Sequence, residues 1–264
     1  MNGRLQDRVA IVTGTARGIG RAIARAYARE GACVVGVDIQ EELGEAAAAE
    51  TAAAGGTMRF VRGDVASEDD VRAIVADVVR EYGRVDVMVN NAVCQIEALP
   101  TDFKVEDFHR MVNVNFLGCA LFCREVLPQM AKQHKGAIVN LSSVNAFALD
   151  PFVPIYGGTK AAIIAYTRSV AVGYGQYGVR ANAICPGDVD TPLNQAYWNQ
   201  QRDPAAFRTR LEREYPVRRI ATPDEIADVA LFLASDEARF VTGAAIVADG
   251  AISAQVYDLV DRPD

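Results

Sequence analysis

Short apolar runs recur along the chain, and a segment of helix length separates most runs from the next. Because buried parallel strands are nearly continuous apolar runs, we expect strands at residues 8–13, 33–37, 58–61, 85–89, 136–141, 181–185 and 244–247. The intervening segments predict helices, the first ending at residue 29 and the others at residues 40–54, 67–82, 105–133 (bent at Pro128), 154–177 and 223–234. This alternation predicts one α/β domain over residues 1–264, built on a doubly wound parallel sheet.

The first strand runs directly into a glycine-rich turn, Thr13-Gly14-Thr15-Ala16-Arg17-Gly18-Ile19-Gly20, and a helix follows it. The second strand then ends in Asp38. A strand, a glycine-rich turn, a helix and a strand ending in an acid are typical of a Rossmann-type nucleotide-binding unit. The glycines allow backbone N–H groups and the helix N-terminus to approach a pyrophosphate. We therefore expect a dinucleotide at this turn.

Asp38 bears on which dinucleotide is bound. It lies eighteen residues after Gly20, where a carboxylate accepts hydrogen bonds from the ribose hydroxyls of the adenosine half. The same carboxylate would repel a 2′-phosphate, so the sequence favours NAD over NADP. Arg17 is the counter-evidence, because a basic residue in this turn can meet a phosphate.

Tyr156 and Lys160 are four residues apart on a predicted helix, which places them on one helix face. A free phenol has a pKa of about 10 and is a poor base at neutral pH. A neighbouring ammonium favours the phenolate and lowers that pKa, so the pair fits proton exchange with a substrate. The same spacing also occurs on ordinary amphipathic helices.

Composition narrows the class of protein. Of the 264 residues, 50% are apolar, which allows a large core, and the net charge of −7 with no dense Lys/Arg run gives no reason to expect nucleic-acid binding. No apolar run approaches the roughly 20 residues of a membrane span, and the polar N-terminus does not resemble a signal peptide. The five cysteines form no C-x-x-C pair and there are two histidines, so we expect reduced thiols, no metal site and a cytoplasmic protein.

Several further segments, in a fixed order, closely resemble the short-chain dehydrogenases/reductases, and the resemblance covers essentially the whole chain. The matching segments are Thr13–Gly20, Asp64-Val65, Asn90-Asn91-Ala92, Asn115 with Gly118, Ser143, Tyr156 with Lys160, Asn182–Gly187 with Thr191, and Asp249-Gly250. Two positions depart from the family pattern. Val93 replaces the glycine of its N-N-A-G segment, which adds bulk near the nicotinamide ribose, and Ala251 replaces the second glycine of D-G-G.

The resemblance implies roles for four residues. Tyr156 is the general acid/base, and Lys160 binds the nicotinamide ribose and stabilises the phenolate. Ser143 orients the substrate oxygen, and Asn115 holds a water of a proton relay. Ser142 is the competing serine, but its spacing to Tyr156 does not match the family. The implied cofactor-binding set is Gly14, Arg17, Gly18, Ile19, Gly20, Asp38, Asp64, Val65, Asn91, Ala92, Tyr156, Lys160, Pro186, Gly187, Val189 and Thr191.

The implied activity is NAD-dependent interconversion of a secondary alcohol and a ketone. The expected substrate-pocket residues, and a lid at about residues 190–214, include many hydrogen-bond acceptors, which favours a sugar, polyol or cyclic diol. Arginines of the lid leave an anionic substrate open. The expected substrate residues are Val93, Gln95, Asn145, Asp188 and Trp198.

Two other readings remain. One is an NADPH-dependent carbonyl reductase of the 3-oxoacyl type, and the other is a non-catalytic dinucleotide-binding protein. The family and the apolar faces of helices 105–133 and 154–177 suggest a homotetramer or a dimer. The tail from residue 253 to residue 264 is a further candidate for contact with a neighbouring subunit.

Overall fold

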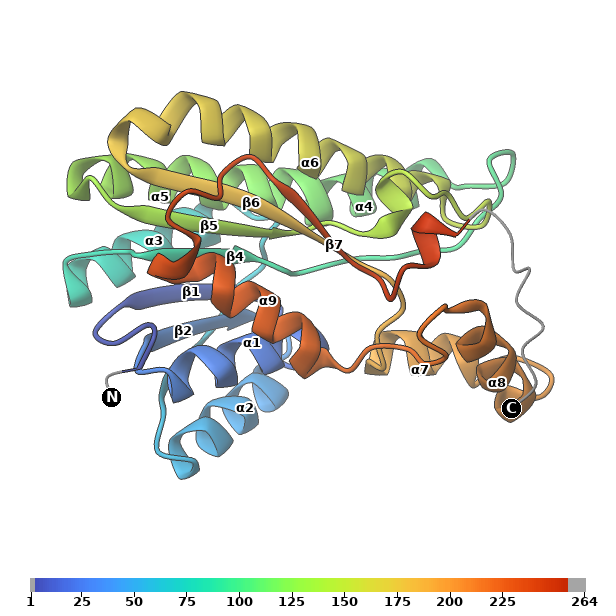
Figure 1. The fold of residues 1–264 in the computed structure, drawn as a ribbon. Coiled ribbons are helices and arrows are strands. Elements are labelled where there is room, and N and C mark those ends of the chain that lie inside the picture. The colour runs from blue at the N-terminus through green and yellow to red at the C-terminus, as the bar shows by residue number, and fades with distance from the viewer. Residues whose placement is uncertain (1–2, 256–264) are drawn as a thin grey trace.

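The computed structural model describes residues 3–255, and one parallel sheet forms its centre (Figure 1). Seven strands lie in the order β3-β2-β1-β4-β5-β6-β7, which confirms the predicted doubly wound α/β fold. The strands are β1 Val9–Thr13, β2 Cys33–Asp38, β3 Thr57–Arg62, β4 Val87–Asn90, β5 Gly136–Leu141, β6 Val179–Pro186 and β7 Ala245–Ala248. The order reverses between β1 and β4, so a crevice opens at their carboxyl ends, where ligands of such sheets bind.

Helices cover both faces of the sheet. One face carries α1 Gly18–Arg29, α2 Glu41–Ala53 and α9 Pro223–Ala234, and the other carries α3 Glu68–Tyr82, α4 Val105–Val112, α5 Gly118–Gln133 and α6 Pro154–Tyr174 (Figure 1). Each layer has its own apolar core. Tyr27 and Leu231 are fully buried in the first, and Phe122 and Met130 in the second.

Two segments differ from the sequence-based expectation. The helix predicted over residues 105–133 is interrupted by a π-helical turn, Asn113–Leu117, whereas α5 continues through Pro128. The polar stretch after residue 190 forms two helices, α7 Pro192–Trp198 and α8 Pro204–Glu214, which extend beyond the carboxyl ends of the strands (Figure 1). Both helices begin with an acceptor side chain followed by proline, which is a strong helix start.

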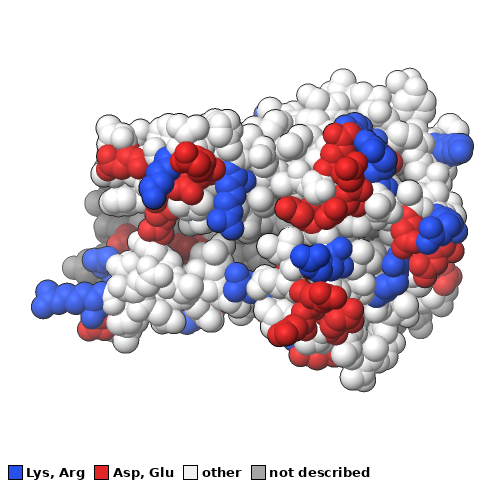
Figure 2. Space-filling model, turned by 180° about the vertical axis from the view of Figure 1, so that it is seen from behind, with Lys and Arg blue, Asp and Glu red and all other residues white. Residues whose placement is uncertain are grey.

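The surface and the chain ends add three observations. In the view from behind, acidic and basic side chains lie together in small mixed groups (Figure 2). Among residues 3–255, no helix has both the length and the apolarity that a membrane crossing requires. The acidic residues of the tail that we expected to reach a neighbour, Asp258, Asp261 and Asp264, lie outside the described residues.

Candidate active site

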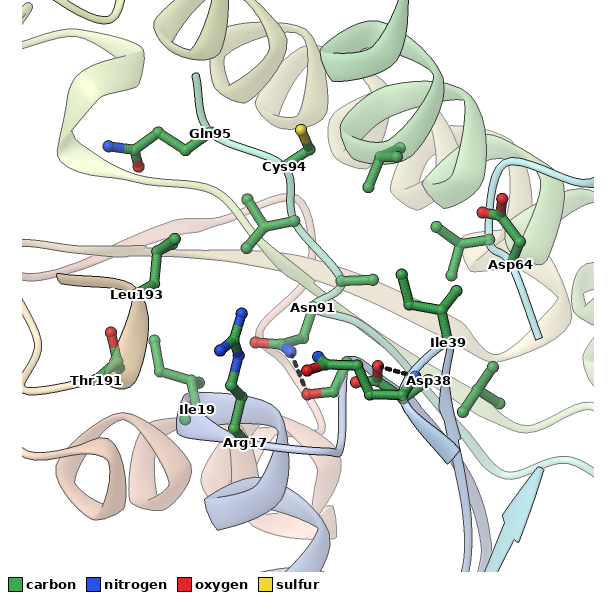
Figure 3. A pocket seen from close by; sticks show the side chains of 18 of the residues that line it. Arg17, Ile19, Asp38, Ile39, Asp64, Asn91, Cys94, Gln95, Thr191 and Leu193 are labelled. Atoms are coloured by element: carbon green, nitrogen blue, oxygen red, sulfur yellow. Dashed lines mark hydrogen bonds between the residues drawn. The ribbon is translucent and has the colours of Figure 1, made fainter. Parts of the chain in front are cut away.

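The glycine-rich turn lies at the crevice, and its conformation needs glycine. Gly14 and Gly18 have φ values of +74° and +61°, in the left-handed region that glycine adopts without strain. A Cβ on Gly20 would lie 2.1 Å from the carbonyl oxygen of Gly14, so α1 packs directly on the turn. The side-chain amide of Asn91 donates to the carbonyls of Thr13 (2.9 Å) and Gly14 (3.3 Å), as Figure 3 shows in part. Asn91 therefore fixes the turn against the end of β4.

The N-terminus of α1 is left without a side-chain cap. Arg17 occupies the capping position and makes no capping hydrogen bond, and the first turn contains no acidic residue. By contrast, Ser67 and Thr222 cap α3 and α9 through their side chains. The first N–H groups of α1 have no side-chain acceptor, and its first residues, Gly18 and Ile19, line the cavity at the crevice, which suits phosphate binding.

Asp38 is held in place by the backbone. One carboxylate oxygen accepts the N–H of Ala16 at 3.0 Å, and the other accepts the N–H of Gln40 at 3.0 Å. The residue borders a cavity of about 370 Å³, which the exposed side chain of Arg17 also lines (Figure 3). Each carboxylate oxygen retains acceptor capacity for a ribose hydroxyl.

The composition of this cavity, which we call the dinucleotide cavity, fits the group that the turn predicts. Its lining includes the carboxylate of Asp38, the apolar side chains of Ile39 and Val65, which suit a purine ring, and the first residues of the uncapped α1. Of the expected cofactor residues it contains Gly14, Arg17, Gly18, Ile19, Asp38, Asp64, Val65, Asn91, Ala92 and Thr191. Val93, which we expected beside the substrate, also lines this cavity rather than the second one described next.

A second cavity of about 300 Å³, which we call the substrate cavity, contains Tyr156 and Ser143. Gln95 lines both cavities, so they adjoin. The structure brings four of the expected substrate residues to this cavity, namely Gln95, Asn145, Asp188 and Trp198. Sequence reasoning missed Tyr215, which lies just after α8 and has no local motif that would mark it.

The two adjacent serines after β5 face opposite ways, as alternation in an extended chain requires. Ser142 is buried and donates its hydroxyl to the carbonyl of Lys160 at 2.8 Å. Ser143 lines the substrate cavity, where its Oγ accepts the N–H of Asn145 at 3.1 Å. Tyr156 lines the same cavity. Ser143 is thus the serine that can reach a substrate oxygen.

Comparison with known proteins agrees with this geometry. A family model described as enoyl-(acyl carrier protein) reductase matches residues 14–253. Oxidoreductase UcpA of Salmonella typhimurium is 40% identical over 253 residues, covering 94% of this chain and 95% of that protein. The 2-(R)-hydroxypropyl-CoM dehydrogenase of Xanthobacter autotrophicus is 40% identical over 253 residues, covering 94% and 99%.

A solved structure from Burkholderia xenovorans, assigned to the short-chain dehydrogenases/reductases, superimposes with a TM-score of 0.93 at 36% identity, covering 97% of this chain and all of that one. This chain is a short-chain dehydrogenase/reductase. It is an oxidoreductase of alcohol and ketone groups, and its family uses nicotinamide dinucleotides.

In this family member Lys160 and Tyr156 lie on one face of α6, where Lys160 is buried and Tyr156 is half-buried. The Lys160 Nζ lies 5.4 Å from the centre of the Tyr156 ring and donates to the carbonyl of Leu141 at 2.6 Å. Burial lowers the pKa of Lys160 to about 8, so this amine can exchange a proton near neutral pH. Because Lys160 is buried, its amine would exchange this proton with neighbouring groups of the site rather than directly with bulk solvent.

The pKa of Tyr156 moves opposite to the sequence-based expectation. It is raised to about 12: burial is the main cause, the neighbouring Ser143 hydroxyl opposes the rise, and the negative charge of Asp188 adds to it. Lys160 was expected to lower this pKa, but in the described structure burial is the larger effect. Proton transfer from a bound alcohol therefore needs further positive charge or donors near the phenol oxygen.

Asn115 lies in the π-helical turn and joins two parts of the site. Its Oδ1 accepts the N–H of Cys94 at 2.7 Å, and its Nδ2 donates to the Cys94 carbonyl at 2.9 Å and to the Thr159 hydroxyl at 3.1 Å. The Asn115 side chain therefore holds the segment after β4 against α6. Its contact on α6 is Thr159, the residue before Lys160. The water expected at Asn115 stays a prediction.

Proposed function

We propose that the protein is an NAD-dependent dehydrogenase that interconverts a secondary alcohol and a ketone on a polar substrate such as a sugar, polyol or cyclic diol. The observation that carries this proposal is the pairing of Tyr156 and Ser143 in a cavity that adjoins the dinucleotide cavity and contains polar acceptors. Asn145 and Asp188 are among these acceptors. A non-catalytic binding protein would have no need of this pairing.

The residues divide the chemistry between them. Ser143 donates to the substrate oxygen and orients it, while Tyr156 accepts the hydroxyl proton of the alcohol. Lys160, which is buried four residues after Tyr156, binds ribose hydroxyls and passes the proton on, with Asn115 keeping the neighbouring segment in place. When bound, the nicotinamide ring supplies the hydride acceptor and a positive charge that favours the phenolate.

Asp38 favours NAD over NADP, because its carboxylate would repel the 2′-phosphate that NADP carries on the adenosine ribose. Arg17 supports the alternative, an NADPH-dependent carbonyl reductase, since it is exposed at the same cavity. Dissociation constants for NADH and NADPH, measured by fluorescence titration, decide between them. Tighter binding of NADH supports the dehydrogenase, and tighter binding of NADPH supports the reductase.

Three further parts of the proposal concern the whole protein. Helices α7 and α8 form the lid over the substrate cavity, because Tyr197 and Trp198 line that cavity from α7.

An apolar groove between α4 and α6, with Phe108 and Ile155 among its residues, supports a homotetramer or dimer, which light scattering measures. The five cysteines are free of disulfides, which supports the cytoplasm as the location, to be tested by cell fractionation.

The activity is tested with purified protein, NAD⁺ and a panel of polyols, sugars, cyclic diols and hydroxy acids, followed at the NADH absorbance. We expect turnover of at least one polyhydroxylated compound and little turnover of hydroxy acids. Absence of NADH formation across the polyhydroxylated compounds would contradict the proposed substrate class, and turnover with NADP⁺ alone would favour the reductase.

A further inference from the structure

Asp188 is the half-buried carboxylate of the substrate cavity, and its position is set by one other residue. It follows the Pro186-Gly187 end of β6 and lines the same cavity as Tyr156. The Tyr215 hydroxyl accepts the backbone N–H of Asp188 at 2.6 Å and donates to its carboxylate Oδ2 at 2.8 Å. Since a phenol has one proton to give, the other carboxylate oxygen is left to accept a donor from within the cavity.

Tyr215 is itself firmly placed. Its ring is buried in a small apolar cluster with Trp198 and Ile220, which α7 and the segment after α8 contribute. A Cβ on Gly187 would lie 2.9 Å from the Tyr215 hydroxyl, so only glycine allows this close approach. The orientation of Asp188 therefore depends on the packing of the lid helices.

The charge of the cavity has one sign. Two exposed carboxylates, Glu97 and Asp150, line it together with Asp188, and among the described residues no lysine or arginine lines it. The lid arginine Arg208 is paired elsewhere, with Asp190 at 2.8 Å and with Glu212 at 3.0 Å. The three carboxylates also do not form a group able to hold a metal ion within residues 3–255.

We infer that Asp188 is the specificity-determining residue, and that it accepts a hydrogen bond from a second donor group of the substrate, a hydroxyl or an ammonium. The same negative charge disfavours substrates that carry a carboxylate, sulfonate or phosphate. Tyr215 is the positioning residue for Asp188. This inference rests on the proposed dehydrogenase function, and it adds a chemical rule for which alcohols the cavity accepts.

A matched set of compounds on one carbon skeleton tests this rule. The set is cyclohexanol, 1,2-cyclohexanediol, 2-aminocyclohexanol and 2-hydroxycyclohexanecarboxylate, which differ only in the second group. Binding is followed through the fluorescence of Trp198, the single tryptophan of the chain, which lines the cavity. This readout reports occupancy without turnover, and kcat/KM with NAD⁺ is measured in parallel.

For the wild-type protein we expect the amino alcohol and the diol to bind more tightly than cyclohexanol, and the hydroxy acid to bind most weakly. A hydrogen bond to a charged group corresponds to a difference of about tenfold or more in affinity. The assays are run at about pH 7, where a primary amine carries its positive charge. Equal affinity for the amino alcohol and the hydroxy acid would overturn the inference.

Asp188→Asn preserves the shape of the side chain and its acceptor for the Tyr215 hydroxyl. We expect it to reduce the preference for the amino alcohol over the hydroxy acid by about tenfold or more. Asp102→Asn is the matched control, because Asp102 is exposed and bonded only to its sequence neighbours, and it should preserve the preference. An unchanged preference in Asp188→Asn would overturn the inference.

Tyr215→Phe keeps the buried ring but removes the hydroxyl, so it tests positioning. We expect the preference for the amino alcohol over the hydroxy acid to fall less than in Asp188→Asn. The variant should raise KM for the diol and leave kcat for cyclohexanol nearly unchanged. If Tyr215 had only a structural role, the variant would change the kinetic constants for the diol and for cyclohexanol to the same extent. That result would overturn the positioning role of Tyr215.

If the compounds bind as expected but none yields NADH, the proposed activity fails while the rule for Asp188 stands. If NADH forms without discrimination, the rule fails alone.

Discussion

The two cavities of the site are built in different ways. The dinucleotide cavity centres on one continuous β1–α1–β2 unit, and its carboxylate, Asp38, is fixed by two backbone N–H groups. The substrate cavity draws on separate parts of the chain, and its half-buried carboxylate, Asp188, is held by the side chain of Tyr215, 27 residues away. Backbone N–H groups thus hold the carboxylate of the dinucleotide cavity, whereas a side chain, which can change without altering the backbone, holds the carboxylate of the substrate cavity.

The largest effect is expected at Tyr156 in the substrate cavity. Tyr156→Phe removes the hydroxyl that exchanges the proton, and we expect kcat/KM to fall by about 10² to 10⁴. NADH affinity should change little, because the ring and the dinucleotide cavity remain. Steady-state kinetics and NADH fluorescence titration measure the two quantities. Activity within about tenfold of wild type would exclude Tyr156 as the general acid/base.

The contrast also explains what the sequence could predict. The turn at Gly14–Gly20, Asp38 and the spacing of Ser143 and Tyr156 are local patterns, so the sequence could predict the fold and the presence of these residues at the two cavities. Val93 was expected beside the substrate but lines the dinucleotide cavity, because the whole segment after β4, including Cys94 and Gln95, runs along that cavity.

Other features have no local signal. Tyr215 reaches Asp188 only through the packing of α7 and α8, which depends on contacts distant in sequence. The π-helical turn at Asn113–Leu117 interrupts a periodic pattern that predicts a regular helix. The raised pKa of Tyr156 follows from its burial and from Asp188, and neither is visible in the spacing to Lys160.

The next effect compares adjacent serines. Ser143→Ala removes a donor to the substrate oxygen, and we expect kcat/KM to fall by about 10²-fold, by analogy with loss of an oxyanion donor. Ser142→Ala removes the bond to the Lys160 carbonyl, so it should lower stability by about 1 kcal/mol and affect kcat/KM far less. Kinetics and thermal melting measure both variants, and equal kinetic losses would show that the assignment of the two faces is wrong.

A smaller effect tests the dinucleotide cavity alone. Asp38→Ala should weaken NADH binding by about tenfold, through loss of bonds to a charged acceptor, and improve relative binding of NADPH. Arg17→Ala should leave NADH preferred. Fluorescence titrations with both nucleotides measure the ratio, and an unchanged ratio in Asp38→Ala would show that another residue selects the cofactor.

The smallest effect is electrostatic and lies within the substrate cavity, between Asp188 and Tyr156. The negative charge of Asp188 raises the pKa of Tyr156, so Asp188→Asn should lower that pKa. Oxidation of the alcohol needs the Tyr156 phenolate, so the rate of oxidation rises with pH as the phenol ionises. In Asp188→Asn this increase in rate should therefore occur at lower pH than in the wild-type protein. The pH profile of kcat/KM is measured with cyclohexanol, which has no second donor. A profile moved to higher pH would contradict the assigned charge effect.

The proposed function requires transfer of hydride from a substrate carbinol to NAD⁺, and isotopic labelling follows this transfer. The most active polyhydroxylated compound is prepared with deuterium on its carbinol carbon and incubated with the wild-type protein and NAD⁺. We predict that deuterium appears at C4 of the reduced nicotinamide, and that Tyr156→Phe transfers almost none under the same conditions. Reduced nicotinamide without deuterium, or equal transfer by the variant, would contradict the account.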